Sequence, residues 1–311
     1  MPLKNDNLLL KNGHLFCNWR YWALGILPFK DDFWSESVEP GNTWGAKEAD
    51  PELQTLVSSL SAGPVGPSDA LQQVNVTRVM QTCRGDGTLL KPSAPAMQLD
   101  STYTAALHRH TAQDNGIAHV WHTVSSAKGV APHNHIILAA NITRATNITV
   151  AELKANAAEI VAAFGRDPVD LNAASFLARE YYSGERRQVS VSVPLALGPQ
   201  KLKPQECAGR GFTHEYCTPF ELWTLTPIPQ GQDPVVLLGE KDKYIGLSPQ
   251  RFGAYKDTPG KLTVEVVGTP GEKVVVELAG SGAYDGSVEC VISASGAAAL
   301  TCGASACHCC S

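Results

Sequence analysis

The stretch Ser58–Asp69 (SSLSAGPVGPSD) decides how the first part of this chain is interpreted. The stretch is an apolar-edged segment that leads directly into a turn rich in Gly and Pro. The turn ends in the carboxylate of Asp69. Glycine permits positive φ and proline locks φ, so we expect this loop to hold Asp69 in a fixed position. A buried strand that opens into such a loop is how α/β barrels present polar groups to a ligand. The pattern therefore predicts the edge of a binding site at Asp69, and a surface turn with an incidental Asp is the alternative.

A similar unit precedes this stretch. The apolar run Ala23–Leu27 predicts a buried strand, and Pro28–Trp34 follows it as a loop. Pro51–Val57 carries Pro and Glu in what reads as a first helical turn, where the missing N–H is harmless and the negative charge suits the helix dipole. The order of strand, acidic loop, helix, strand and acidic loop corresponds to one and a half βα units of a parallel sheet.

After about residue 85 the chain changes character. Short β-type runs between turn residues predict an antiparallel β-sandwich. The clearest expected hairpin is Val264–Val276, with Thr269–Gly271 as its turn. One helix, Val150–Phe164, competes, because its apolar residues recur at helical spacing and Gly165 supplies a stop. The expected strands are Leu89–Pro92, Ile117–Val124, Asn134–Ala140, Ser175–Tyr182, Gln188–Leu197, Phe220–Leu225, Val235–Leu238, Tyr244–Leu247, Leu262–Val267 and Lys273–Leu278.

Composition bounds the function classes. With 311 residues, 43% of them hydrophobic, the chain can bury a sizeable core and is expected to hold two domains. The net charge of −5 and the absence of Lys/Arg runs argue against nucleic acid as a partner. No apolar window is long enough to predict a membrane span, and Leu8–Leu10 is too short for the core of a signal peptide.

Other features favour the secretory pathway or the extracellular space. Three N-glycosylation sequons begin at Asn75, Asn141 and Asn147. Among the nine cysteines, Cys207 and Cys217 bracket a short polar loop that a disulfide could close. Cys290 and Cys302 lie in two β-prone segments around Ser293–Gly296, and we expect them to face each other across a hairpin as a second candidate disulfide.

Metal and cofactor sites are not predicted. The Cys-rich tail, Cys302–Ser311, contains soft ligands, but the paired spacing of structural zinc sites is absent. His133 and His135 would share one face of a strand, yet no acidic or Cys partner lies at a supporting spacing. The same holds for the other candidates, His108, His110, His119 and His122. No Gly-rich phosphate loop precedes a helix, so no nucleotide cofactor is expected.

At this point the residues carry a family resemblance. The acidic loop Phe29–Trp34, a helix, and Leu60–Asp69 look like the last two βα units of raffinose synthase-like and α-galactosidase-like glycoside hydrolases, whose barrel ends in a Gly-Gly-Pro-Val-x-x-Ser-Asp segment. Asp86–Pro92, Pro95 and Asp100 are similar to the segment that leads from that barrel to a C-terminal β-sandwich. Val235–Tyr244 resembles a strand of the sandwich. The match covers about residues 20 to 100, with diffuse similarity to about residue 280.

The resemblance implies a barrel followed by a β-sandwich, and it implies that most of the barrel is missing from this sequence. A complete (β/α)8 barrel takes about 250 residues, and fewer precede the sandwich here. We therefore expect residues 1–85 to be the closing βα units of an incomplete barrel and residues 86–311 to be the β-sandwich with its Cys-rich tail. Retaining glycosidases use two carboxylates on different strands. Neither is carried over onto this sequence, so the chain is expected to be the C-terminal part of a larger protein, or an incomplete gene product, and to be inactive alone.

The residues that match are suited to positioning a sugar. Asp31 and Asp32 can accept hydrogen bonds from vicinal hydroxyls, and Trp34 offers a flat apolar face to a sugar ring. With Asp69 they form the expected carbohydrate site, and the implied ligand is an α-linked galactoside or a related oligosaccharide. A helix cap or solvated loop, with Trp34 in the core, is the alternative. For the whole chain, the alternatives are a non-catalytic β-sandwich module that binds glycans or stabilises a partner, and a scaffold without a ligand.

Overall fold

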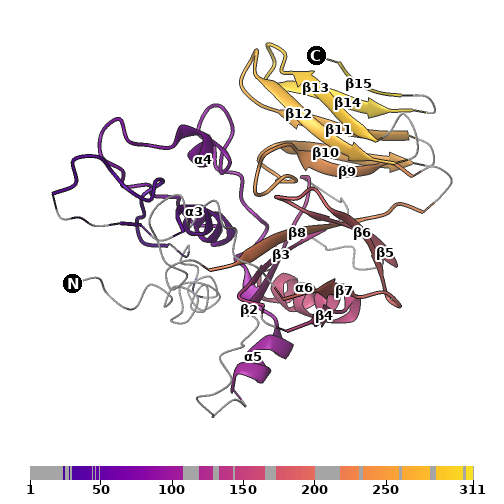
Figure 1. The fold of residues 1–311 in the computed structure, drawn as a ribbon. Coiled ribbons are helices and arrows are strands. Elements are labelled where there is room, and N and C mark those ends of the chain that lie inside the picture. Colours follow the sequence, from indigo (N-terminus) through magenta and orange to yellow (C-terminus); the bar gives the residue numbers. More distant parts are fainter. Residues whose placement is uncertain are drawn as a thin grey trace.

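The structure is a computed structural model with two β-rich parts and an N-terminal segment that lies beside them (Figure 1). It describes residues 24, 28, 30–43, 45, 47–48, 50–107, 119–128, 133–142, 144–164, 173–199, 218–230, 234–258, 261–280, 285–303 and 306–310. The first part is a six-stranded sheet, and the second is a sandwich of two smaller sheets. All the strand ladders among the described residues are antiparallel. The antiparallel character expected after residue 85 is thus confirmed.

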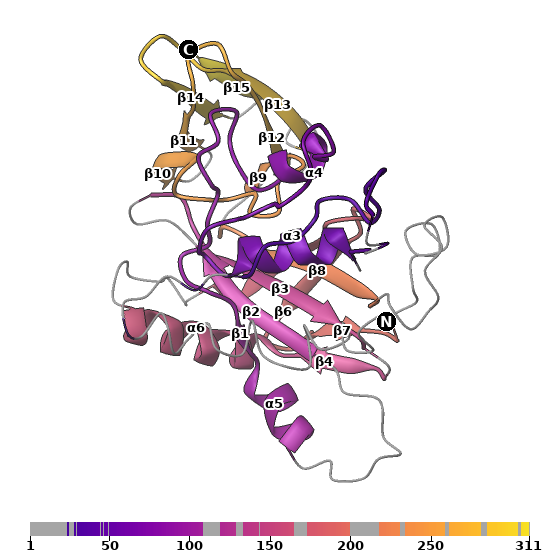
Figure 2. The ribbon, with the colours of Figure 1, turned by 90° about the vertical axis from the view of Figure 1, so that its left-hand side faces the viewer.

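The six-stranded sheet forms the centre of the molecule. Its order is β1-β2-β3-β8-β5-β6. Helices lie on both of its faces (Figure 2), which explains why β2 and β3 are buried along nearly their whole length instead of alternating. The strands are β1 (Met97–Gln98), β2 (His119–Ser125), β3 (Asn134–Ala140), β5 (Ser175–Glu180), β6 (Arg186–Ser190) and β8 (Phe220–Pro227).

Each face of the central sheet has its own core. Helix α3 (Pro51–Leu60) packs Leu53, Leu56 and Leu60 against one face, where Trp121 and Leu138 meet it. Helix α6 (Val150–Phe164) and the two-stranded ribbon of β4 (Thr146–Ile148) and β7 (Leu195–Leu197) cover the other face. Successive residues of a strand point to opposite faces, so Ile137 and Leu138 belong to different cores. Two short helices, α4 (Val76–Met80) and α5 (Asp100–Leu107), complete this part.

The second part is an antiparallel sandwich. One sheet has the order β13-β12-β9 and the other β10-β11-β14-β15, with a shared apolar core between them. Alternate residues of each strand point into that core, as the burial of Val264 and Val266 on one sheet and Val274 and Val276 on the other shows. The strands are β9 (Val236–Glu240), β10 (Phe252–Thr258), β11 (Lys261–Val267), β12 (Lys273–Ala279), β13 (Gly286–Val291), β14 (Ala297–Cys302) and β15 (Cys307–Cys310).

The expected hairpin Val264–Val276 is wrong. Strand β11 pairs with β10 and β14, whereas β12 pairs with β9 and β13. The Thr269–Gly271 turn is present but carries the chain from one sheet to the other. Turn chemistry and alternation alone cannot distinguish a hairpin from such a crossing, because both require the same local pattern.

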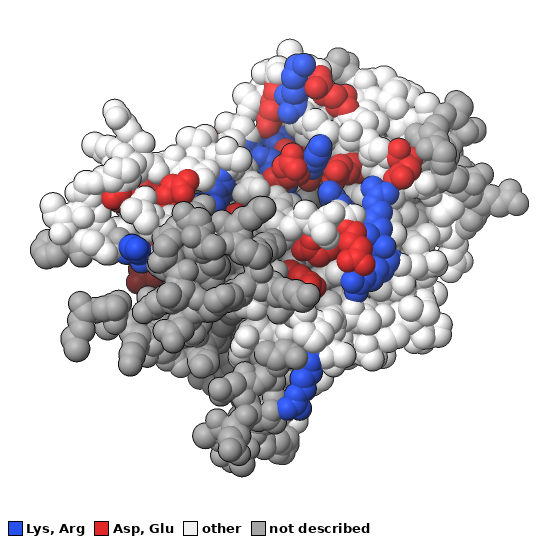
Figure 3. Space-filling model, in the orientation of Figure 1, with Lys and Arg blue, Asp and Glu red and all other residues white. Residues whose placement is uncertain are grey.

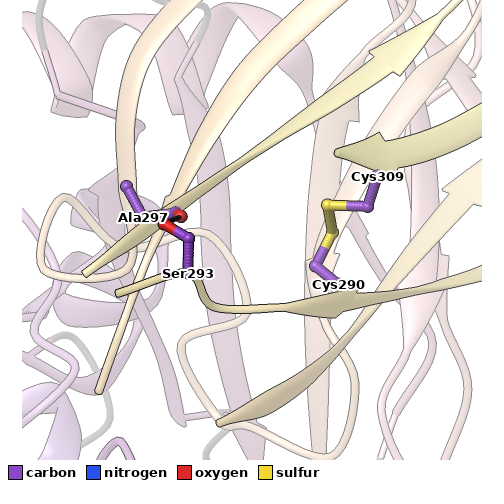
Figure 4. The surroundings of a disulfide bond; sticks show 4 residues. All are labelled: Cys290, Ser293, Ala297 and Cys309. Atoms are coloured by element: carbon purple, nitrogen blue, oxygen red, sulfur yellow. Dashed lines mark hydrogen bonds between the residues drawn. A yellow bond between two sulfur atoms is a disulfide. The ribbon is translucent and has the colours of Figure 1, made fainter. Parts of the chain in front are cut away.

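The expected pairing of Cys290 with Cys302 is wrong for the same reason. The two cysteines lie on β13 and β14, which belong to different sheets. Cys290 is bonded instead to Cys309, which joins the two sheets (Figure 4), and Cys302 is bonded to Cys307 within one sheet. The predicted pair of Cys207 and Cys217 lies outside the described residues. Two disulfides are typical of an oxidising compartment.

The two helices expected from the sequence are both present, whereas α4 and α5 were not predicted. Helix α6 has the expected bounds, and the helix at Pro51 is confirmed but runs on to Leu60. Ser58–Leu60 are therefore helical, and the strand expected there is wrong. Leu60 lies one turn after Leu56, so both face the central sheet. Tyr244–Leu247 form a turn instead of a strand.

Of the residues Ala23–Leu27, where a buried strand is expected, the structure describes only Leu24. That residue lies in a turn and is 74% exposed, so it does not fit a buried strand. The described residues do not show a barrel end, since α3 packs on an antiparallel sheet. Among them, no helix is long and apolar enough to cross a membrane.

The N-terminal segment is also tied to the sandwich. Arg251 is fully buried and forms ion pairs with Glu240 and Glu272, each at 2.7 Å. Glu272 also accepts a hydrogen bond of 3.0 Å from the backbone N–H of Gly85. Lys243 donates to the carbonyl oxygens of Met80 and Cys83. These contacts fix residues 80–85 against the sandwich.

Candidate functional site

Two loops that carry all four predicted sugar-binding residues lie side by side. We call residues 30–36 and 64–69 the loop pair. Phe33 and Pro67 form a parallel bridge, the only parallel pairing in the described part of the chain. The N–H of Phe33 donates to the carbonyl of Gly66 at 3.3 Å, and the N–H of Ser68 donates to the carbonyl of Phe33 at 2.9 Å. The structure therefore brings together loops that are about 35 positions apart in the sequence.

Gly63 allows the two segments to approach. A Cβ atom at this position would lie 1.6 Å from the carbonyl oxygen of Pro28 and 2.8 Å from its carbonyl carbon. Real Cβ atoms never approach backbone so closely, so only glycine fits here without a backbone shift. The glycine of the Gly-Pro stretch is thus required by close packing with the preceding segment.

Asp69 is held by the opposite loop. Its Oδ1 accepts hydrogen bonds from the backbone N–H and from the hydroxyl of Ser35, at 2.7 and 2.8 Å. The Oγ of Ser35 in turn accepts from the N–H of Asn75 at 2.7 Å. The second oxygen of Asp69, Oδ2, is buried and has no hydrogen-bond partner among the residues that the structure describes. The carboxylate is therefore fixed at one oxygen, and its other oxygen is shielded from solvent.

The other predicted residues lie at the surface of the same loops. Asp31 and Asp32 are exposed, and Trp34 is half-buried. A hydrogen bond from the Ser68 side chain, followed by one to Asp31, lowers the pKa of the Asp32 carboxyl. Because Ser68 belongs to the second loop, this bond is a further contact across the pair.

A buried lysine lies beside these carboxylates. Lys30 donates from Nζ to the carbonyl oxygen of Asp31 at 3.0 Å, and its ammonium lies over the ring of Phe33. Burial lowers the pKa of Lys30, and the neighbouring Glu48, Asp31 and Asp32 oppose that shift. Acidic and basic side chains also mingle across the face seen in Figure 3.

A network of hydrogen bonds and one ion pair, which the sequence analysis did not predict, connects the loop pair to α3. Arg78 donates to the carbonyl of Ser35 and forms an ion pair of 3.4 Å with Glu52 at the beginning of α3. Glu52 accepts from the hydroxyl of Tyr244 at 3.2 Å. The same hydroxyl lies 2.9 Å from Oε1 of Gln81. No short motif links these residues, because they come from distant segments.

Aromatic side chains continue the network. Tyr181 and Tyr182 meet edge to face, with 4.9 Å between their ring centres, and both are half-buried. Gln81 donates to the hydroxyl of Tyr181 at 3.0 Å. Burial raises the pKa of both phenols and of Tyr244, so all three remain protonated donors. The adjacent Tyr181-Tyr182 pair is the one signal that a sequence reading could have used.

The histidines do not form a metal centre in the described part of the chain. His122 and His135 stack between the central sheet and α6, with 2.9 Å between Nε2 and Nδ1, and His122 Nδ1 lies 2.6 Å from Oδ1 of Asn156. Burial lowers the pKa of His122 to about 4 and lowers that of His135 as well. Both rings are therefore neutral near pH 7. No group of three metal-ligating side chains occurs among the described residues, and His108 and His110 lie outside them.

The three sequons have different surroundings. Asn75 is the N-cap of α4 and is half-buried, Asn141 follows β3 with φ of 53°, and Asn147 is exposed on β4.

A comparison of the chain with known protein families and with characterised proteins finds no match.

Proposed function

We propose that this chain binds an α-linked galactoside or a related oligosaccharide at the loop pair, as the C-terminal part of a glycoside hydrolase-like protein. The parallel bridge between Phe33 and Pro67 is the observation that carries the proposal. The four residues chosen from the sequence for sugar recognition lie on the two loops that this bridge joins, although the loops come from separate segments of the chain. Chance placement of unrelated surface residues would not require them to meet.

The chemistry of the loops suits a sugar. The exposed carboxylates of Asp31 and Asp32 can accept hydrogen bonds from neighbouring hydroxyls, and each such charge-assisted bond is stronger than a neutral one. Trp34, on the same loop, supplies an apolar ring. Asp69 ties the second loop to the first, because its Oδ1 accepts hydrogen bonds from Ser35. Directional acceptors next to an aromatic face are complementary to a ring with polar edges and an apolar side.

The path of the chain also supports the resemblance. The segment around Phe33, the helix α3 and the segment around Pro67 follow one another, and the two segments meet at one parallel bridge. A parallel contact with an intervening helix is the arrangement of a βαβ unit. We interpret this segment as a remnant of a barrel end. The resemblance carries no catalytic carboxylate onto a residue of this sequence, so we expect binding without hydrolysis from the chain alone.

Binding of raffinose and melibiose to the full chain, measured by titration calorimetry and saturation-transfer NMR, tests the proposal. We expect Asp32→Asn and Trp34→Ala each to weaken binding by about tenfold, which corresponds to one good hydrogen bond or ring contact. Glu289→Gln is the matched control, because it removes an exposed carboxylate from the sandwich.

Three outcomes would contradict the proposal. Binding that survives both loop variants would place the ligand on the β-sandwich and favour the non-catalytic module. Absence of binding to any α-galactoside would remove the carbohydrate function. Turnover that is lost on changing a carboxylate of the chain would contradict the expected lack of hydrolysis.

A further inference from the structure

The side chain of Asn147 projects from the outer face of a small ribbon. Strand β4 pairs with β7 in register, with Asn147 opposite Ala196 and Ile148 opposite Leu195. Ile148 and Leu195 are buried against the central sheet, whereas Asn147 and Ala196 are exposed. Directly opposed residues share one face of a ribbon. The residue directly opposite Asn147 on that outer face therefore contributes only a methyl group, and the exposure of Asn147 leaves its amide open to solvent.

Asn75 has the opposite environment. Its Oδ1 accepts from the N–H of Arg78 at 3.0 Å as the cap of α4, and its Nδ2 donates to Oε1 of Glu36 at 2.6 Å. The backbone N–H of Asn75 also donates to Ser35, whose hydroxyl holds Asp69. Both ends of this amide are therefore engaged, and its surroundings fix the loop pair. A bulky group on Nδ2 would have to enter a packed junction of charged side chains.

We infer that the sequon at Asn147 carries an N-linked glycan in the folded protein, and that the sequon at Asn75 stays unmodified. The donor is an oligosaccharide linked to a polyprenyl pyrophosphate. The amide nitrogen of Asn147 bonds to the anomeric carbon, the bond from that carbon to the pyrophosphate oxygen breaks, and the amide releases one proton. A chain modified at Asn75 loses the contacts that hold α4 and the first loop, so it does not reach the folded state.

The position of β4 keeps the glycan away from the candidate ligand site. Ile148 belongs to the core on the α6 face of the central sheet, whereas α3, which leads into the second loop, packs on the other face. Figures 1 and 2 show β4 and α3 on opposite sides of the sheet. The glycan therefore covers the apolar ribbon without blocking the loop pair, and this inference stands independently of the proposed ligand.

The test uses the full chain with a cleavable signal peptide, secreted from a eukaryotic host. Release of glycans by peptide-N-glycosidase F in heavy-oxygen water labels each occupied asparagine, and peptide mass spectrometry then identifies it. We expect the label at Asn147 in most of the secreted protein and none at Asn75. An unlabelled Asn147, or label at Asn75 in folded protein, would overturn the inference.

Two variants sharpen the result. Asn147→Gln should remove the mass of one glycan and leave secretion and the melting temperature of the deglycosylated protein unchanged, because the side chain is exposed. Changing Thr149 instead would also remove a cap, since its Oγ1 accepts from the N–H of Glu152 at 3.2 Å. Thr77→Ala destroys the Asn75 sequon at an exposed position and keeps the Asn75 cap. It should leave the mass of the attached glycans unchanged, and a loss of glycan mass would contradict the inference.

Discussion

The loop pair and the C-terminal sandwich are held together in different ways. The sandwich has continuous strand ladders, an apolar core, two disulfides and a buried arginine between two carboxylates. The loop pair has a single parallel bridge and a few bonds from side chains to backbone. Redundant contacts make the sandwich insensitive to most single changes, whereas the positions of the acidic side chains depend on a few residues. Such a difference is typical of binding loops on a rigid scaffold.

The largest effect is expected at Arg251. Arg251→Met leaves the buried Glu240 and the half-buried Glu272 without their common partner, and loss of one member of a buried pair costs about 3–5 kcal/mol. Denaturant unfolding should show this loss in the sandwich. The control Lys273→Ala breaks an exposed pair with Glu289 and should cost under about 1 kcal/mol. Equal losses in the two variants would mean that the buried pair is not the stabilising contact described here.

Acid should destabilise the central sheet before the sandwich. Burial lowers the pKa of His122 to about 4, below the ordinary 6.5, so the unfolded chain binds this proton more readily. Above pH 6.5, His122 therefore does not reduce the free energy of unfolding. As the pH falls toward 4, protonation of His122 in the unfolded chain lowers this free energy by roughly 3 kcal/mol. In the sandwich, hydrogen bonds from Arg251, Gly85 and Thr269 outweigh burial and lower the pKa of Glu272 to about 2. Its contribution is present above pH 4.5 and is lost only as the pH falls toward 2.

The acid step of the central sheet can be followed with tryptophan fluorescence, because Trp121 and Trp223 lie in that sheet. Free energies of unfolding between pH 7 and pH 4 should fall in the unmodified chain. The decrease should be smaller in His122→Gln than in the unmodified chain. In His308→Gln, which alters an exposed residue, the decrease should equal that of the unmodified chain. A pH profile that is identical in all three proteins would exclude His122 as the cause.

The two disulfides should contribute unequally. The Cys290–Cys309 bond closes a loop of 19 positions and the Cys302–Cys307 bond closes one of 5. The loop-entropy relation assigns them about 3 and about 2 kcal/mol. Replacing Cys290 and Cys309 with Ala should therefore lower the stability of the sandwich more than replacing Cys302 and Cys307. The reverse order, measured by denaturant unfolding, would show that loop length does not govern this region.

A selective effect on the loops, without a change in the sandwich, is expected at Gly63. Gly63→Ala forces the backbone away from Pro28 and should cost about 1–3 kcal/mol locally, as overpacking does. Raffinose binding should weaken while the unfolding of the sandwich stays unchanged. Gly198→Ala is the control, since a Cβ there meets nothing within 4 Å. Unaltered binding in Gly63→Ala would show that the loops tolerate separation.

The sequence predicted local features better than pairings. Helix α6 and strand β3 have the expected bounds, because periodicity and Gly stops are read within one segment. The hairpin at Val264–Val276 and the partner of Cys290 were wrong, because sheet membership depends on residues far along the chain.

The same limit applies to the candidate site. Asp69 and Asp32 could be selected from loop composition, and the structure places their loops together. The supporting residues Arg78 and Glu52 could not be found this way. Their roles arise only when α4 packs against α3, and no local spacing records that contact.

Hydrogen exchange at the loop pair tests the central claim most directly. With saturating raffinose, the amides of Phe33 and Ser68, which bond across the bridge, should exchange more slowly, while amides of β12 and β14 remain unchanged. Protection confined to the sandwich, or no protection at either loop in a protein that binds the sugar, would contradict the assignment of the ligand to the loop pair.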